Sequence, residues 1–152
     1  GDGNNMTHSL MYAAAKVGMH FAAATPEGYE PNAEVVANAK ADAAATGATI
    51  TITHNPMEAV AGADVIVTDT WASMGQEAEH DARTAVFRPY QVNAELVAAS
   101  GNARYIVMHC LPAYRGEEIT EDVFEAFADV IFDEAENRLH VQKAIMALVM
   151  GD

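Results

Sequence analysis

The hydrophobic pattern of this chain alternates between short apolar runs, two of which are rich in β-branched residues, and longer helix-forming stretches. The short runs predict strands over residues 20–24, 49–53, 64–68, 105–109 and 129–132. Helices are predicted over residues 6–17, 32–46, 57–61, 93–100 and 134–150, with an irregular stretch containing one helical piece over 71–92. Alternation of this kind favours parallel pairing, because each crossover helix returns the chain to the same edge. The sequence therefore predicts a three-layer α/β fold, a parallel sheet with helices on both faces.

In such a sheet, ligands bind beyond the carboxyl ends of the strands. Four polar or reactive clusters stand where strands should end, at residues 1–5, 69–75, 109–112 and 133–138. We expect them to meet at one edge. The first cluster looks like a turn that follows a strand, yet no strand precedes it. We therefore expect the first strand of the sheet to be missing from this chain and to lie on another chain or in a longer parent polypeptide.

The charge and cysteine content narrow the classes of function. The 152 residues fit one domain, residues 1–152, and carry a formal net charge of -14 with only 8 lysines and arginines. That balance opposes binding to nucleic acid and to anionic membranes, and no apolar run is long enough to span a bilayer. With one cysteine there is no internal disulfide and no cysteine-based zinc cage. No secretory signal is visible, and a lone thiol suits the cytoplasm.

The stretch from Asp69 to Gly75 is the most informative one for function. Asp69 follows an apolar strand, where a carboxylate can meet a cationic ligand in a partly dry cleft. Ser73 and Gly75 suggest a loop with hydroxyl and backbone hydrogen-bond donors. Met74 would form an apolar cover over the cleft. A purely structural interpretation remains open, in which Asp69 caps a turn and the large apolar side chains pack the core.

The dipeptide His109-Cys110 ends another strand. A cysteine there is either a small buried apolar residue, a hydrogen-bond donor or a thiolate. A Cys–His nucleophile pair is disfavoured, because neighbouring residues on a strand point to opposite faces. The other histidines lack metal-ligand spacing, so no metal is expected.

The two outer clusters carry weaker signals. Gly1-Asp2-Gly3 lacks the third glycine of a dinucleotide loop, which disfavours a nucleotide site. Asn4 and Asn5 are either helix caps or ligands for an amino acid. Arg138, placed at the start of the predicted last helix, opposes the helix dipole, which suggests an anion contact; a salt bridge to Glu134 is the alternative.

Together these clusters resemble the ornithine carbamoyltransferases. The matching segments occur in the family's order and span nearly the whole chain: Gly1-Asp2-Gly3-Asn4-Asn5, Ala24-Thr25-Pro26-Glu27-Gly28-Tyr29, Asp69-Thr70-Trp71-Ala72-Ser73-Met74-Gly75-Gln76-Glu77, His109-Cys110-Leu111-Pro112 and Glu134-Ala135-Glu136-Asn137-Arg138. The Ser-Met-Gly loop and the His-Cys-Leu-Pro motif together are specific for this family, since aspartate carbamoyltransferases lack the pair.

The resemblance implies a fold, a reaction and residue roles. The fold is the Rossmann-like domain of the aspartate and ornithine carbamoyltransferases. The reaction is the attack of neutral ornithine on carbamoyl phosphate, giving citrulline and phosphate in arginine biosynthesis, without metal or organic cofactor. The implied ornithine contacts are Asn5, Asp69, Ser73 and Met74, with Asp69 on the α-amino group. Cys110 is implied beside the reacting δ-amine as the catalytic residue, and Cys110, Leu111 and Arg138 as carbamoyl phosphate contacts.

The departures from the family are also informative. The Ser-x-Arg-Thr-Arg phosphate loop of the family's N-terminal domain is absent, so the isolated chain is expected to be inactive without that domain or a complementary chain. The complete enzyme is implied to be a homotrimer. Tyr114 stands where many bacterial relatives have histidine. Two alternatives remain: a non-catalytic amino-acid-binding module, and a dinucleotide-binding domain, which the incomplete glycine motif disfavours.

Overall fold

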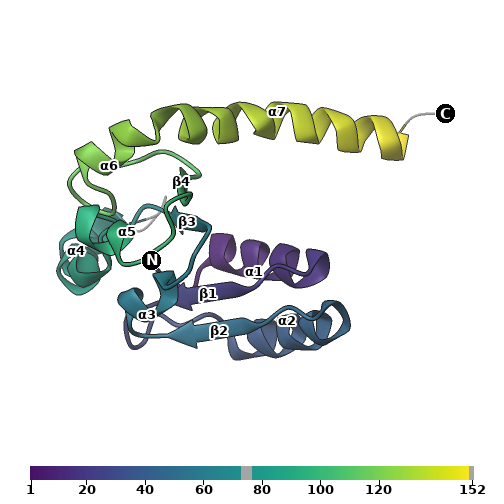
Figure 1. The fold of residues 1–152 in the computed structure, drawn as a ribbon, viewed down its shortest axis with the longest axis horizontal. Coiled ribbons are helices and arrows are strands. Elements are labelled where there is room, and N and C mark those ends of the chain that lie inside the picture. Colours follow the sequence, from purple (N-terminus) through teal and green to yellow (C-terminus); the bar gives the residue numbers. More distant parts are fainter. Residues whose placement is uncertain (73–76, 151–152) are drawn as a thin grey trace.

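The computed structural model describes residues 1–72 and 77–150 of the chain and has α/β architecture (Figure 1). Its strands are β1 (Phe21–Ala24), β2 (Ile50–Thr53), β3 (Val65–Thr68) and β4 (Ile106–His109). Its α-helices are α1 (Asn5–Val17), α2 (Ala33–Thr46), α3 (Pro56–Val60), α4 (His80–Phe87), α5 (Ala94–Ala98), α6 (Glu121–Ala126) and α7 (Ala128–Met150). Two short 3-10 helices, η1 (Glu77–Glu79) and η2 (Arg88–Tyr90), flank α4.

The strands pair in parallel, which confirms the predicted fold class. They form two two-stranded sheets, β1–β2 and β3–β4. Among residues 1–72 and 77–150, no strand joins the two pairs into one sheet.

Each strand pair has its own apolar core. Helices α1 and α2 pack on each other and on the first pair, in a cluster made of Met11, Ala15, Ala39, Ala43 and Ile50. Helices α5, α6 and the start of α7 cover the second pair, in a cluster that includes Leu96, Val107, Ile119, Phe124 and Ile131. The alanines let α1 and α2 approach closely, because small side chains leave little between the two backbones.

Asparagine caps and glycines place the helix ends near their predicted positions. Asn32 accepts hydrogen bonds from the backbone N–H groups of Glu34 and Val35, at 2.8 and 3.3 Å, and so begins α2. Gly18 and Gly47 end α1 and α2 with φ near +80°, a conformation that glycine adopts without steric cost.

The predicted strand over 129–132 is wrong, because these residues form the first turns of α7. The N–H of Ile131 donates to the carbonyl of Phe127 at 3.0 Å, a helical bond. Ile131 is buried whereas its neighbour Phe132 is half exposed, as on one face of a helix. A short apolar run does not distinguish a buried strand from a helix by its periodicity alone. Helix α6 was not predicted either.

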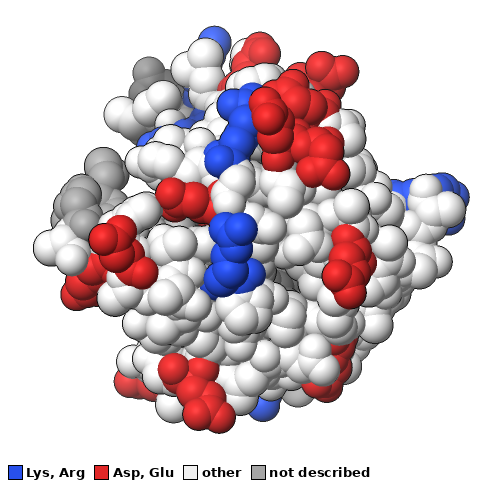
Figure 2. All heavy atoms as spheres, turned by 90° about the vertical axis from the view of Figure 1, so that its left-hand side faces the viewer, with Lys and Arg blue, Asp and Glu red and all other residues white. Residues whose placement is uncertain are grey.

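The face that carries α4, α5 and α6 shows both signs of charge: acidic groups are spread over it, and basic groups lie near its middle and top (Figure 2). The net charge of the whole chain is -14, which opposes binding of phosphate backbones in general. Within residues 1–72 and 77–150, no helix combines the length and the hydrophobicity needed to cross a bilayer.

Candidate active site

The carboxyl ends of β3 and β4 bring Asp69 and Cys110 into contact. The two strands pair with Thr68 opposite His109, so the residue after each strand stands at the same edge of the sheet. The Cys110 Sγ donates to Asp69 Oδ1 over 3.2 Å, and the N–H of Thr70 donates to the same oxygen at 2.7 Å. Asp69 and Cys110 are both partly exposed. A carboxylate is thus held at the edge where the sheet rule places ligands, as predicted.

The environment keeps the Cys110 thiol protonated. Burial, the hydrogen bond to Asp69 and the negative charges of Asp69 and Glu134 raise the pKa of Cys110 to about 12. Burial also raises the pKa of Glu134, whose Oε2 accepts a hydrogen bond from the backbone N–H of His109 at 3.0 Å. Of the three states considered for Cys110, the structure supports the hydrogen-bond donor and opposes the thiolate.

This arrangement predicts slow alkylation of Cys110. At pH 8 a thiol with a pKa near 12 has a thiolate population about a thousandfold smaller than one with a pKa near 9, so iodoacetamide should react slower by about that factor. The rate should keep rising above pH 9, and Asp69→Asn should increase it. The time course is measured by intact mass spectrometry, which reads one site because the chain has one cysteine. A rate like that of free cysteine, levelling off near pH 9, would contradict the assignment.

A buried hydrogen-bonded unit holds the turn that contains Cys110. His109 Nδ1 accepts from the N–H of Leu111 at 2.9 Å, so Nε2 carries the proton and donates to Glu118 Oε1 at 3.0 Å. The same Glu118 oxygen accepts from the N–H of Tyr114 at 2.6 Å. His109 and Glu118 are fully buried, Leu111 has φ +56°, and the peptide bond from Leu111 to Pro112 is cis. His109 is thereby a structural residue and not a base for Cys110.

A second buried group, Arg83 on α4, fixes the loop that carries Asp69. Its side chain forms an ion pair with Asp2 and donates from Nε to the carbonyl oxygen of Trp71. Its guanidinium carbon lies 5.1 Å from the ring centres of both Tyr29 and Phe87. An arginine can satisfy carboxylate, carbonyl and aromatic partners together because its guanidinium is planar and carries five donors.

The Gly1–Asn5 segment is a turn into α1. Asn4 caps the helix, accepting from the N–H groups of Met6 and Thr7 at 3.0 and 3.4 Å, whereas Asn5 is the first helical residue and is exposed. The N–H of Gly3 donates to the carbonyl of Tyr29 at 2.7 Å. A Cβ at Gly3 would lie 2.1 Å from the nitrogen of Pro31, so only glycine fits there.

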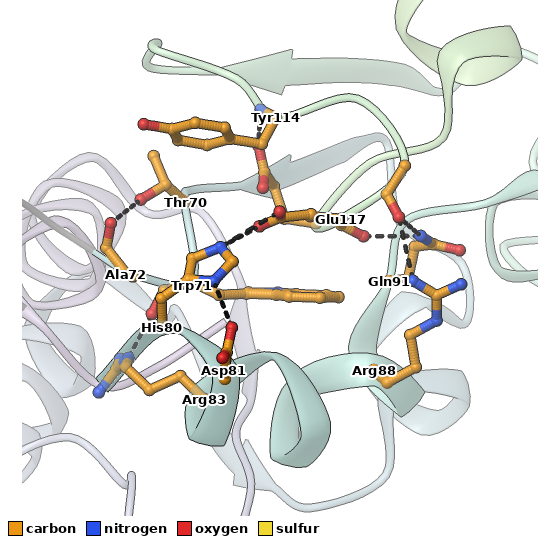
Figure 3. Close-up of polar contacts among 12 residues, drawn as sticks. Thr70, Trp71, Ala72, His80, Asp81, Arg83, Arg88, Gln91, Tyr114 and Glu117 are labelled. Atoms are coloured by element: carbon orange, nitrogen blue, oxygen red, sulfur yellow. Dashed lines mark hydrogen bonds and ion pairs between the residues drawn. The ribbon is translucent and has the colours of Figure 1, made fainter. Parts of the chain in front are cut away.

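A cavity of about 340 Å³ lies between the loop after β3, α4 and the loop that follows β4. Its lining residues are Ala72, Ala78, His80, Asp81, Tyr114 and Glu117. Figure 3 shows His80 between Asp81 and Glu117. Tyr114, whose role the sequence left open, stands on this cavity and is half exposed.

Apart from Asn5, described above, the predicted site residues divide into three groups. Asp69, Cys110 and Leu111 lie together at the sheet edge. Ser73 and Met74 fall outside the described residues. The placement of Arg138 at the start of the last helix is wrong, because it lies well inside α7, where it is exposed, and the dipole argument for it no longer holds. From that cluster Glu134 reaches the site instead.

Three contributing residues had no clear signal in the sequence. Glu118, Arg83 and His80 stand among ordinary polar residues, and a single sequence does not show which charged groups become buried. The strongest available hint was that arginine is scarce in this chain, which made each one more informative.

Comparisons with known proteins agree with this geometry. Residues 1–149 match the family model described as aspartate/ornithine carbamoyltransferase, Asp/Orn binding domain. The ornithine carbamoyltransferase of Thermococcus kodakarensis is 57% identical over 151 residues, 99% of this chain and 48% of that protein. The crystal structure of the Pyrococcus furiosus ornithine carbamoyltransferase superposes with a TM-score of 0.92 at 55% identity, over 99% of this chain and 48% of that one. The crystal structure of the Gloeobacter violaceus ornithine carbamoyltransferase superposes with a TM-score of 0.89 at 49% identity, over 99% of this chain and 50% of that one.

The chain thus spans about half the length of the curated relatives that it matches. The match covers both strand pairs, the Asp69 and Cys110 loops and nearly all of α7. The chain belongs to the Asp/Orn-binding domain family of the aspartate and ornithine carbamoyltransferases.

Proposed function

We propose that this chain is the ornithine-binding half of an ornithine carbamoyltransferase, which transfers a carbamoyl group from carbamoyl phosphate to the δ-amine of ornithine. The observation that carries the proposal is the contact between Asp69 Oδ1 and Cys110 Sγ at the carboxyl ends of β3 and β4. It places a carboxylate next to a protonated thiol in a chain whose relatives are named ornithine carbamoyltransferases.

The charges of this edge suit a dibasic amino acid. Asp69 and Glu134 both lie close enough to raise the pKa of Cys110, so the edge is negative and attracts the cationic forms of ornithine. Oδ1 of Asp69 is engaged by Thr70 and Cys110, and its second oxygen is the one we assign to the α-ammonium group. An aspartate substrate, with its extra carboxylate, would be repelled there.

The reaction needs the neutral δ-amine. An alkyl amine of this kind has a pKa near that of lysine, about 10.4, so the protonated form dominates at pH 7. The nitrogen lone pair attacks the carbamoyl carbon, the bond from that carbon to the phosphate oxygen breaks, and the nitrogen loses one proton to give citrulline and phosphate. Cys110, held as a thiol by Asp69, is the group that we place beside the δ-amine, where its sulfur can accept a weak hydrogen bond.

We propose substrate contacts for five further residues. Asn5, Ser73 and Met74 would contact ornithine, and Leu111 and Arg138 would contact carbamoyl phosphate. Leu111 is the best supported of these, since its positive φ and the His109–Glu118 unit fix its backbone beside Cys110. We also infer that the complete enzyme is a homotrimer. From the free thiol of Cys110 we infer that the enzyme works in the reducing environment of the cytoplasm.

The remaining half of the enzyme would bring the phosphate-binding loop. We therefore expect no citrulline synthesis by this chain alone, because positioning and charge stabilisation of the leaving phosphate supply much of such catalysis. Joined to the other half of the Gloeobacter violaceus enzyme, in a protein called the hybrid enzyme below, it should form citrulline from ornithine and carbamoyl phosphate. A colorimetric assay for citrulline measures the activity of the isolated chain and of the hybrid enzyme.

Two outcomes would count against this account. Turnover by the lone chain at the rate of an intact enzyme would show that no second half is needed. A hybrid enzyme that folds and binds ornithine without turnover would favour the alternative of a non-catalytic amino-acid-binding module.

A further inference from the structure

Helix α4 connects the two loops that carry Asp69 and Cys110, and it does so through two side chains one turn apart. Arg83 donates to the carbonyl oxygen of Trp71, two residues beyond Asp69. His80 contacts Glu117, in the loop that follows Cys110, with 3.0 Å between Nε2 and Oε2. Figure 3 shows both side chains on the same helix with their different partners. Any change in the His80 contact therefore alters how the two loops are held relative to each other.

The geometry of His80 indicates its charge state. Nδ1 lies 3.2 Å from Asp81 Oδ1, and Nε2 lies 3.0 Å from Glu117 Oε2. Ionised carboxylates only accept hydrogen bonds, and a neutral imidazole donates from one nitrogen only. Both contacts together require the imidazolium form. The hydrogen bonds to Asp81 and to Glu117 accordingly raise the pKa of His80. Among the described residues that line the cavity, Tyr114 is the titratable side chain besides His80, Asp81 and Glu117.

Hydrogen bonds couple the position of Glu117 to the turn that contains Cys110. The N–H of Glu117 donates to the carbonyl of Tyr114 at 3.0 Å. The next residue, Glu118, binds the N–H of Tyr114 and the ring of His109, the neighbour of Cys110. From Glu117 to Cys110 the loop is thus one hydrogen-bonded unit, and its outer end is held by His80.

Two further side chains hold the same loop through hydrogen bonds that do not involve His80. Arg88 and Gln91 both donate to the carbonyl oxygen of Gly116 at 3.0 Å, and Gln91 also donates to that of Glu117 at 2.6 Å. Loss of the proton from His80 should therefore loosen the loop without releasing it.

We propose that protonated His80 is a positioning residue for the ornithine site, holding the loop after Cys110 in register with the loop that carries Asp69. The inference rests on the proposed function for its effect on ornithine, while the contact between His80 and Glu117 stands on the geometry alone. Because the pKa of His80 is raised by folding, the stabilising contact is fully present below about pH 6.5 and is lost as pH rises through the folded value.

The test compares His80→Gln with the unmodified hybrid enzyme between pH 6 and pH 9. The ratio of the two KM values for ornithine is the readout, because the titration of ornithine itself cancels in the ratio. We expect the variant to raise KM about two- to fivefold at pH 6, the range for a partly exposed ion pair, and the ratio to approach one by pH 9. Glu117→Gln should give the same profile. The matched control is His140→Gln, which breaks a histidine–glutamate pair of 3.0 Å on α7, and should leave the ratio flat.

A melting temperature measured over the same pH range provides a readout independent of activity. The difference between the unmodified protein and His80→Gln should shrink from pH 6 to pH 9. If the KM ratio and this difference are both independent of pH, or match those of His140→Gln, the proposal is overturned. An unmodified hybrid enzyme that makes no citrulline would instead count against the proposed function, and the melting data would still decide whether the His80 contact exists. Glu117→Gln serves the same purpose if His80→Gln does not fold.

Discussion

Asp69→Asn should weaken ornithine binding by about one to two powers of ten, because a charge-assisted contact in a partly desolvated site is worth ~1.5–3 kcal/mol. The substitution keeps the shape of the side chain and its hydrogen bond with Thr70, and removes the negative charge. Affinity for carbamoyl phosphate should barely change. Calorimetric titration of both ligands into the hybrid enzyme measures the two effects.

The matched control for this experiment is Asp64→Asn, since Asp64 precedes the amino end of the same strand, where its carboxylate binds the side chain of Asn102 at 2.8 Å. It should leave ornithine affinity unchanged. If Asp69 only caps a turn, then Asp69→Asn should lower the melting temperature with no effect on ornithine. That result would remove Asp69 from the site.

Arg83→Met should destabilise the protein by about 3–5 kcal/mol, the usual consequence of removing one partner of a buried ion pair. Methionine fills part of the volume but leaves Asp2 without its counter-charge and the carbonyl of Trp71 without its donor. Arg83 is only 4% exposed, so water cannot replace these contacts. For a chain of this size the loss corresponds to a fall of roughly 10 °C in melting temperature.

Arg104→Met provides the comparison, because Arg104 is exposed and its replacement should cost less than about 0.5 kcal/mol. The double variant Asp2→Asn with Arg83→Met should recover part of the stability, since it leaves no unpaired charge. Equal melting temperatures for Arg83→Met and Arg104→Met would mean that the buried ion pair contributes nothing to the fold.

Most of the local structure could be predicted from the sequence because its signals are local. The four observed strands, and the capped helices that end at Gly18 and Gly47, follow from periodicity and terminal residues within a few positions. The meeting of Asp69 and Cys110 followed from one topological rule about parallel sheets.

The failures share a physical cause, because each depends on tertiary contacts. The apolar residues of the predicted strand 129–132 suit a strand or a helix equally, and in the fold they form the start of α7, where Ile131 packs into the core beside β4. Arg83 is buried because it pairs with Asp2, which lies far away along the chain. Glu118 is buried because it binds the N–H of Tyr114 in a turn whose backbone conformation cannot be predicted from its residue types. His80 contacts Glu117 because the loop that follows β4 approaches α4, and that contact joins segments far apart in the sequence.

We propose that the hybrid enzyme selects ornithine over aspartate, although the name of the family includes both. The most direct test supplies the hybrid enzyme with labelled carbamoyl phosphate and equal concentrations of ornithine and aspartate, and separates the products by chromatography. We predict that the label appears in citrulline, because the negative charges of Asp69 and Glu134 at this edge should attract a dibasic amino acid and repel a second carboxylate. Label found mainly in N-carbamoylaspartate would contradict the account.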